Sequence, residues 1–175
     1  MAANWTDFVS GDVLTASQLN GVLDNFQDIA IFREEQANST NGGTFTSGSY
    51  LKRTLNTTVV NNIAGCSIAS SVITLPAGTF YVTAFAPAQE VNRNKLRLQN
   101  TTASTTLQVG NNAYASAADV GSNIATLQSV FTLATSSTIE LQHRCQATLA
   151  SAGFGVAMSF SDVEVYASIT IQRIA

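Results

Sequence analysis

The side chains best suited to chemistry in this 175-residue sequence are its single histidine, His143, and the nearby Cys145. A thiol and an imidazole could act together as nucleophile and base. Residues two apart on a strand, however, have Cβ atoms about 7 Å apart, and no positioned acid accompanies this pair. His143 shares the apolar side of its predicted strand with Ile139 and Leu141. We therefore favour a buried, hydrogen-bonded histidine over a functional one.

Other catalytic and ligand-binding patterns are not found in the sequence. Cys66 and Cys145 match no metal-site spacing, and buried free thiols are expected, with a disulfide as the alternative. A glycan-cleaving enzyme would need two acids facing one cleft. The acids that follow residue 40 are Glu90, Asp119, Glu140, Asp162 and Glu164. We expect a protein that is not an enzyme and that uses no metal or other cofactor.

A basic stripe is the one concentrated group of like charges. Arg93, Lys95 and Arg97 alternate along a predicted strand and therefore share one of its faces. They could be a solvated strand face that discourages edge pairing. They could instead form a polar contact, either a row of inter-subunit salt bridges or a site for an anionic glycan. The candidate partners of such a contact are Glu140, Arg144 and Glu164.

The composition indicates a neutral surface. Charged residues make up 11% of the sequence, less than half the usual share of about 25%, and Thr, Ser, Asn and Gln take their place. Such a surface suits a particle exterior or a protein–protein contact better than the electrostatic steering of a ligand. The net charge of −3 is far from the basic density that nucleic acid binding requires.

An amphipathic helix is predicted over residues 15–36. Thr15 and Gln18 have the spacing of a capping box. Apolar residues then recur at steps of three and four residues, at Leu19, Val22, Phe26 and Ile29. A lone helix of this length is marginal in water, so we expect it to self-associate or to pack on another protein.

The residues before this helix extend the same module. Trp5 and Phe8 belong to an apolar lead-in that either folds back on the helix or inserts into a socket on another protein. The N-terminus has no basic region followed by an apolar one, so it does not predict a secretory signal. No run of about 18 apolar residues predicts a membrane span. We expect residues 1–40 to be an attachment segment and residues 41–175 to form a separate domain.

After residue 40 the hydrophobic period changes from helical to alternating, which predicts an all-β domain. Strands are expected at 50–60, 67–75, 79–87, 93–100, 105–110, 126–134, 137–147, 153–160 and 163–174, with a long loop over 111–125. About eight antiparallel strands fit a double-sheet jelly roll. An immunoglobulin sandwich would place a Trp in this domain, and the only Trp is Trp5.

Several runs in this domain resemble the C-terminal domain of phage fibre and head-decoration proteins. They are Leu75–Val82 (LPAGTFYV), Ala86–Leu98 (APAQEVNRNKLRL), Glu140–Gln146 (ELQHRCQ) and Glu164–Ile171 (EVYASITI). The opening runs Trp5–Phe8 and Gly11–Asn20 look like the start of short phage fibre proteins. The C-terminal domain of that group is similar to the trimeric jelly roll of tumour-necrosis-factor-like and complement-head proteins. The resemblance covers residues 44–175.

The resemblance implies a homotrimer whose final strand lies close to the threefold axis. We accordingly expect trimer or attachment contacts at Trp5, Phe8, Leu19, Val22, Phe26, Ile29, Tyr166, Ile169 and Ile171. The implied location is a virion assembled in the host cytoplasm. The implied partners are other copies of the chain, other virion proteins through residues 1–40, and a host-surface glycan or protein. Neither a nucleic acid nor a membrane is expected as a partner.

Two roles within a virion remain open at this point. The first is a tail or head fibre that presents the jelly roll for host-surface binding. The second is a capsid cement or decoration protein that stabilises the head at threefold positions. A protein that proved monomeric would speak against both.

Overall fold

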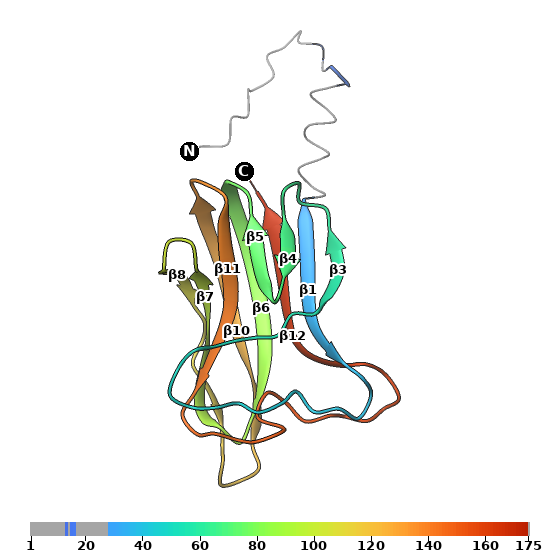
Figure 1. Ribbon diagram of the computed structural model, residues 1–175, viewed down its shortest axis with the longest axis vertical. Coiled ribbons are helices and arrows are strands. Elements are labelled where there is room, and N and C mark those ends of the chain that lie inside the picture. Colours follow the sequence, from blue (N-terminus) through green and yellow to red (C-terminus); the bar gives the residue numbers. More distant parts are fainter. Residues whose placement is uncertain (1–12, 14, 17–27, 175) are drawn as a thin grey trace.

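The computed structural model describes residues 13, 15, 16 and 28–174, and the long segment forms one β-rich head. Two antiparallel sheets face each other across a shared core (Figure 1). This is the mostly β, double-sheet jelly roll that the alternating sequence pattern predicts. In the described part of the chain, no helix is long and apolar enough to cross a membrane.

The strands of the head follow one another in chain order. They are β1 (Ile29–Gln36), β2 (Leu51–Lys52), β3 (Thr57–Asn61), β4 (Ser67–Ala69), β5 (Val72–Leu75), β6 (Gly78–Gln89), β7 (Asn92–Asn100), β8 (Thr105–Val109), β9 (Ala113–Ala115), β10 (Ser122–Leu133), β11 (Ser137–Cys145) and β12 (Glu164–Arg173). The longest, β6 and β10, pair with each other along their whole length.

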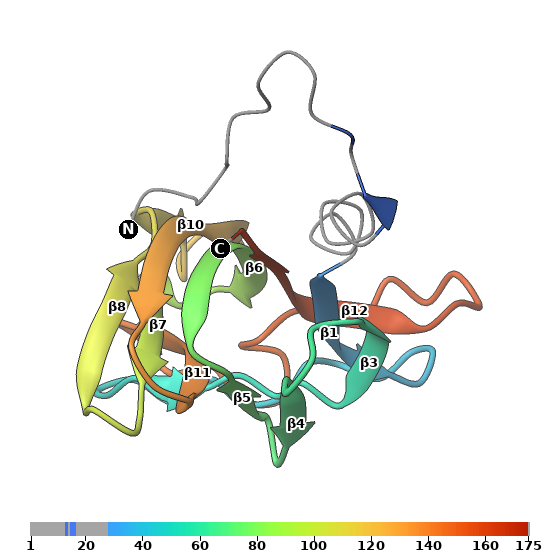
Figure 2. The same cartoon turned by 90° about the horizontal axis from the view of Figure 1, so that it is seen from above.

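The strands form a five-stranded and a seven-stranded sheet, which Figure 2 shows from above. The five-stranded sheet has the order β10-β6-β12-β1-β3. The seven-stranded sheet has the order β4-β5-β11-β7-β8, with β2 paired to β11 and β9 paired to β7. The chain passes repeatedly from one sheet to the other, as expected for a jelly roll.

Alternation along the long strands builds the core. In β6, Phe80 and Val82 are fully buried, whereas Tyr81 and Thr83 between and after them are partly exposed. The seven-stranded sheet contributes the fully buried side chains of Ile73, Leu75, Leu96, Leu98, Ile139 and Leu141. Burying a side chain of this size stabilises the fold by about 1.5–3 kcal/mol, so the inward faces hold the two sheets together.

The first strand corrects the helix predicted over residues 15–36. Residues Ile29–Gln36 are β1, which is hydrogen-bonded to β12 on one side and to β3 on the other. Ala30, Phe32 and Glu34 are buried at alternate positions. A period of two is satisfied once two strand partners are in place, and tertiary pairing then overrides the local helical stripe.

This finding also moves the start of the jelly roll. Residues 29–40 belong to the head rather than to an attachment segment, since β1 lies inside the five-stranded sheet. Most of the remaining predicted helix lies outside the described residues. The same holds for five predicted contact residues, Trp5, Phe8, Leu19, Val22 and Phe26.

Four other predicted elements differ from the structure. The strand predicted at 50–60 is divided into β2 and β3, which belong to different sheets. The strand predicted at 67–75 is a hairpin of β4 and β5, because Ser70 and Ser71 have positive φ angles of 50° and 63° and turn the chain. The strand predicted at 153–160 is irregular, and Gly155 there has a φ of +132°. The loop predicted at 111–125 contains β9 and the start of β10.

The two ends of the head are different. Strand β1 begins and β12 ends at the same end (Figure 1). The long connections 37–50, 116–121 and 146–163 gather at the opposite end, which we call the distal end. The N-terminal end of β1 therefore lies far from these connections.

Candidate binding surfaces

The predicted basic stripe lies on β7, on the outer face of the seven-stranded sheet. Antiparallel pairing places Lys95 directly opposite Arg144 of β11, and Arg93 opposite Tyr114 of β9. Directly opposed residues point to the same side of a sheet. Arg144, which was a candidate partner of the stripe, therefore adds a further cation to it rather than a counter-charge.

Together with Tyr50 and Tyr114, these cations line an open groove of about 790 Å³, which we call the basic groove. It is centred on Tyr50, Arg93, Lys95, Tyr114 and Arg144. The neutral residues Ser47, Gly48, Asn94, Asn112, Ala113, Cys145 and Gln146 complete its lining. No acidic residue lines the groove, so its described surface presents positive charge beside aromatic rings.

The other two candidate partners of the stripe lie elsewhere. Glu140 forms an ion pair with Lys52, whose Nζ lies 3.9 Å from the carboxylate oxygen. Glu164 lies in the five-stranded sheet. It accepts hydrogen bonds from the backbone N–H groups of Met158, Ser159 and Ser39, which lower its pKa. Glu164 thus ties the connection before β12 to the segment after β1.

The outer face of the five-stranded sheet is almost uncharged and carries apolar side chains among neutral polar ones, and we call it the apolar face. Its outward positions include Tyr81, Thr83, Phe85, Pro87, Ile124, Thr126, Gln128, Val130, Ser168, Thr170 and Gln172. Among the outward positions of the five strands of this sheet, as far as the structure describes them, the charged side chains are Arg33 and Glu35 of β1, which lie 4.0 Å apart. A binding partner for this face would have to be neutral as well.

The distal half of the apolar face contains a hollow of about 680 Å³. Seven exposed apolar side chains line it, namely Phe85, Ile124, Val156, Met158, Phe160, Val163 and Val165. Phe160 is 78% exposed, which is unusual for a residue of its size. Contiguous exposed apolar patches on a soluble protein mark contact sites, so this hollow is the strongest indication of a protein partner.

The predicted interface residues of the head occupy different places. Ile29 lies half-buried on β1. Ile169 and Ile171 are fully buried in the subunit's own core, so their side chains are not available for an interface with another copy. Tyr166 is also buried, and its hydroxyl donates a hydrogen bond to the carbonyl of Thr40 at 2.8 Å.

Sequence reasoning missed the residues that form the apolar face. Phe85 and Val130 occupy outward positions of long alternating strands, where a polar side chain is usual. These apolar residues in the outward register were the available signal. The contribution of Met158 and Phe160 could not be read in this way, since they lie in an irregular connection.

Gly155 fixes the rim of the hollow. Its φ is +132°, and a Cβ atom there would lie 2.5 Å from Cδ1 of Tyr166. Gly155→Ala is expected to lower the free energy of unfolding by about 1–3 kcal/mol, measured by urea denaturation. Gly43→Ala is the matched control, because Gly43 has a φ of +101° but no atom within 4 Å of its Cβ position. Equal losses in both variants would contradict the clash with Tyr166.

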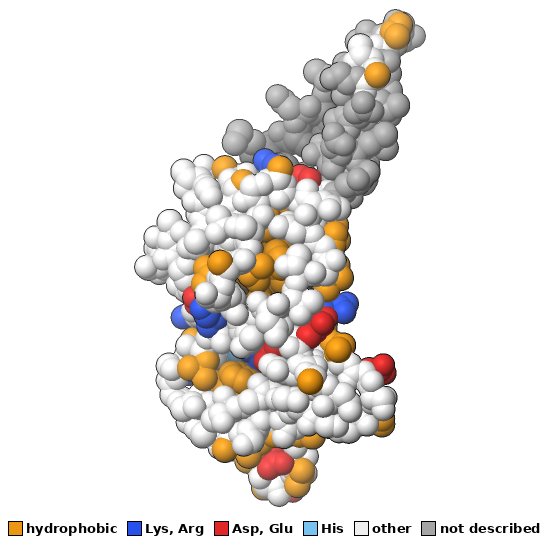
Figure 3. Space-filling model, turned by 45° about the vertical axis from the view of Figure 1, so that its right-hand side comes forward, with side chains coloured by type: hydrophobic (Ala, Val, Ile, Leu, Met, Phe, Trp, Pro, Cys, Tyr) orange, Lys and Arg blue, Asp and Glu red, His pale blue; other side chains and the backbone are white. Residues whose placement is uncertain are grey.

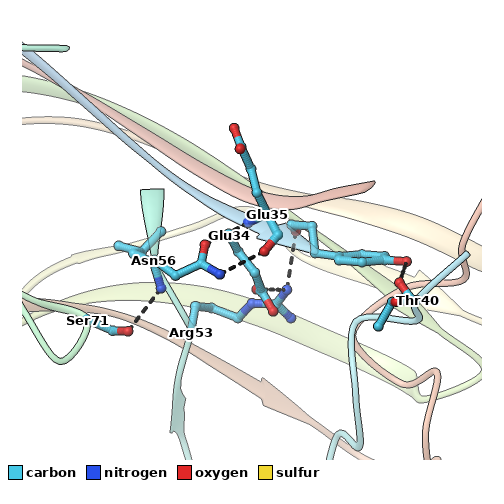
Figure 4. Close-up of polar contacts among 8 residues, drawn as sticks. Glu34, Glu35, Thr40, Arg53, Asn56 and Ser71 are labelled. Atoms are coloured by element: carbon cyan, nitrogen blue, oxygen red, sulfur yellow. Dashed lines mark hydrogen bonds and ion pairs between the residues drawn. The ribbon is translucent and has the colours of Figure 1, made fainter. Parts of the chain in front are cut away.

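A buried polar cluster lies between the sheets (Figure 4). Nη2 of Arg53 lies 2.7 Å from the carboxylate of Glu34, and it also donates to the carbonyl of Tyr166 at 3.2 Å. The guanidinium lies 4.0 Å over the ring of Phe154. Burial raises the pKa of Glu34 and lowers that of Arg53, and their mutual attraction opposes both shifts. The cluster connects β1, β12 and the distal connections.

His143 is the buried, hydrogen-bonded histidine that the sequence predicts. Its side chain is fully buried, and Nε2 lies 3.1 Å from Oδ1 of Asn94. Its ring centroid is 4.7 Å from that of Phe45. Burial and the nearby Arg53 lower its pKa well below the ordinary value. At neutral pH, His143 is therefore an uncharged part of the core.

This lowered pKa predicts a pH dependence of stability. The unfolded chain binds a proton at His143 as the pH falls below about 6.5, whereas the folded head does not. The free energy of unfolding should therefore fall between about pH 7 and 5. His143→Gln should reduce the slope, as measured by urea denaturation at several pH values. An unchanged slope in this variant would show that His143 is not the titrating group.

The two cysteines do not support nucleophilic chemistry. Both are free thiols. Burial raises the pKa of Cys66 and of Cys145 to about 11, so neither is a thiolate at neutral pH. The thiol of Cys145 contacts the carbonyl of Phe45 at 3.8 Å, while His143 is engaged with Asn94. Within residues 28–174, no group of three or more His, Cys, Asp or Glu side chains could hold a metal ion.

Comparison with solved structures defines the fold class. The globular domain of zebrafish complement 1qA protein is 17% identical, with a TM-score of 0.54 over 85% of this chain and 98% of that one. Murine APRIL at pH 5.0 is 8% identical, with a TM-score of 0.50 over 82% of this chain and 98% of that one. The PRD1 vertex protein P5 is 17% identical, with a TM-score of 0.48 over 85% and 97%.

The likenesses to the complement 1qA domain and to APRIL at pH 5.0 establish a jelly roll of the tumour-necrosis-factor and complement 1q type. The resemblance stated for the sequence is confirmed at the level of this fold. No protein-family model matches the chain, and no curated protein sequence is similar to it.

Proposed function

We propose that this chain is a homotrimeric structural protein of a bacteriophage particle, a fibre whose jelly-roll head binds the host surface. The observation that carries the proposal is the apolar face with its hollow. The assignment to a bacteriophage is supported by the sequence runs that resemble phage fibre and head-decoration proteins, such as Leu75–Val82.

A second copy of the chain is the partner that best fits the apolar face. The face offers apolar side chains together with neutral Thr, Ser and Gln residues. Because only 11% of the residues are charged, a neighbouring copy can meet this face with a neutral part of its own surface, so that no unpaired charge is buried at a cost in the contact. A contact that repeats between different parts of identical chains closes into a ring when its rotation allows. Three copies would match the homotrimer that the sequence resemblance implies.

The arrangement of the two ends supports a projecting head. Residues 1–28 precede β1, which begins at the end opposite to the distal connections. An anchor in this N-terminal segment would direct the distal end away from the particle. Several such heads on one particle would raise the avidity for a host surface by about 10²–10⁴ over that of a single site.

A capsid cement protein is the second candidate. Neutral side chains dominate the surface in Figure 3, with charged residues in small, separate groups. This surface suits contacts with neighbouring capsid subunits, for which no long-range charge attraction is needed. A cement protein would use the same trimer but would bind capsid subunits instead of a host surface.

Two measurements test the proposal. Light scattering on the purified full-length chain should give a mass of about 55 kDa, three times the 18.4 kDa of one chain. The protein should also compete with the phage for adsorption to host cells. A monomer would contradict both candidates. A trimer that does not compete, together with particles that become heat-labile when the protein is lost, would favour the cement protein.

A further inference from the structure

We infer that the basic groove binds an acidic glycan, a sugar chain that carries carboxylate or sulfate groups. The groove lies on the outer face of the seven-stranded sheet, around Tyr50, Arg93, Lys95, Tyr114 and Arg144. The inference rests on the proposed function, and it names the class of host-surface ligand that the head would bind.

The first argument is positive charge without a counter-charge. The side chains of Arg93, Lys95 and Arg144 form no ion pair or hydrogen bond with the described part of the chain. Lys95 and Arg144 are directly opposed on neighbouring strands, an arrangement that destabilises a sheet. The chain has eight Lys and Arg residues in all. A bound anion would supply the charge that the protein itself does not provide.

The second argument is the chemistry of the neutral lining. The ring of Tyr114 is 59% exposed and lies beside Arg93. Such a ring presents a flat apolar surface and a polar hydroxyl, which matches a sugar with an apolar ring face and hydroxyl edges. Asn112 and Gln146 add amides that both donate and accept hydrogen bonds. An inorganic anion would use the cations but not these other groups.

The third argument is that one wall of the groove is held in place. Nε of Arg97 donates to Oε1 of Gln142 at 2.7 Å, and Nε2 of Gln142 donates to Glu140 at 2.6 Å. The Arg97 guanidinium lies 4.0 Å from the centroid of the Tyr50 ring. Arg97 thus has a positioning role. Lys95 and Arg144 form no ion pair with the described residues, and Arg144 lies 5.9 Å from the centroid of the Tyr50 ring, inside the groove. Such preorganisation reduces the entropy lost on binding.

The size and position of the groove also fit this ligand. Its volume of about 790 Å³ lies within the usual range of about 300–1,000 Å³ for ligand sites. It lies on the distal half of the head, since β7 begins and β11 ends there (Figure 1). The apolar face belongs to the other sheet, so the groove is not part of that face. A few cations per chain would hold a nucleic acid only weakly at physiological salt.

The test uses the full-length protein and immobilised heparin, which carries both sulfate and carboxylate groups, with neutral dextran as the blank. Lys95→Gln with Arg144→Gln should raise the Kd for heparin at least about tenfold, because charge-assisted hydrogen bonds are lost. Tyr114→Ala should raise it about fivefold without changing the charge. Lys95→Gln alone should raise the Kd at least about threefold, whereas Arg173→Gln removes one charge outside the groove lining and should change the Kd less than about twofold.

Several outcomes would overturn the inference. These are no binding of heparin, an equal loss in Arg173→Gln and Lys95→Gln, no effect of Tyr114→Ala, and stronger binding of poly-glutamate than of heparin. Light scattering and thermal unfolding confirm that each variant is folded, and Lys95→Gln alone replaces the double variant if that one is not. A trimer that does not bind heparin refutes the groove only. A monomer that binds heparin refutes the trimer only.

Discussion

Glu34→Gln is expected to lower the free energy of unfolding of the head by about 3–5 kcal/mol. The carboxylate lies 2.7 Å from Nη2 of Arg53, and the two side chains are 2% and 0% exposed. Removing the negative charge leaves a guanidinium in the core whose desolvation is no longer compensated. Since domains are stable by about 5–15 kcal/mol, this variant should lose a large part of its stability. Urea denaturation at neutral pH measures the difference.

Two further variants make this prediction specific. Glu140→Gln breaks the partly exposed ion pair with Lys52 and should cost less than about 1 kcal/mol. Glu34→Gln with Arg53→Met replaces the buried cation by an apolar side chain and should regain part of the stability. If Glu34→Gln cost no more than Glu140→Gln, the interaction between Glu34 and Arg53 could not be the buried ion pair described above.

Phe85→Asp is expected to convert the proposed trimer into monomers. Phe85 lies on the apolar face, between Thr126 of β10 and Ser168 of β12. The substitution removes an apolar contact and places a carboxylate in a neutral interface, where no counter-charge is available. Symmetry repeats the defect in every subunit contact. Light scattering should show the mass fall from about 55 kDa to the 18.4 kDa of one chain.

Val120→Asp is the matched control for this variant. Val120 is an exposed apolar residue, at 71% exposure, in the connection 116–121 at the distal end and outside the hollow. It should leave the mass near that of a trimer. Far-ultraviolet circular dichroism should show the same β-sheet content in both variants. A Phe85→Asp protein that remained trimeric would mean that the subunits do not meet through the apolar face.

The two surfaces would divide assembly and ligand binding between the two sheets. The five-stranded sheet carries the neutral, apolar face, and the seven-stranded sheet carries the cations of the basic groove. Because these surfaces face away from each other across the core, a change in one should leave the other intact. The variants at Phe85 and Lys95 can therefore be interpreted independently.

The sequence by itself determined the features that depend on local period. Alternation predicted the β-rich head, the last strand, the burial of His143 and the common face of Arg93, Lys95 and Arg97. A period of two fixes which side of a strand a residue occupies, whatever its partner strand is. The resemblance of the runs in residues 44–175 added the jelly-roll type, which the solved structures confirm.

Only the tertiary structure decided which residues meet. Local period says nothing about strand order or register, because these depend on pairings between residues far apart in the chain. Thus the local pattern over residues 29–36 favours a helix, whereas pairing with β12 and β3 makes this segment strand β1. Register also placed Arg144 beside Lys95, and packing sent Ile169 into the core and brought Arg53 to Glu34. The basic groove and the apolar face are products of these non-local contacts.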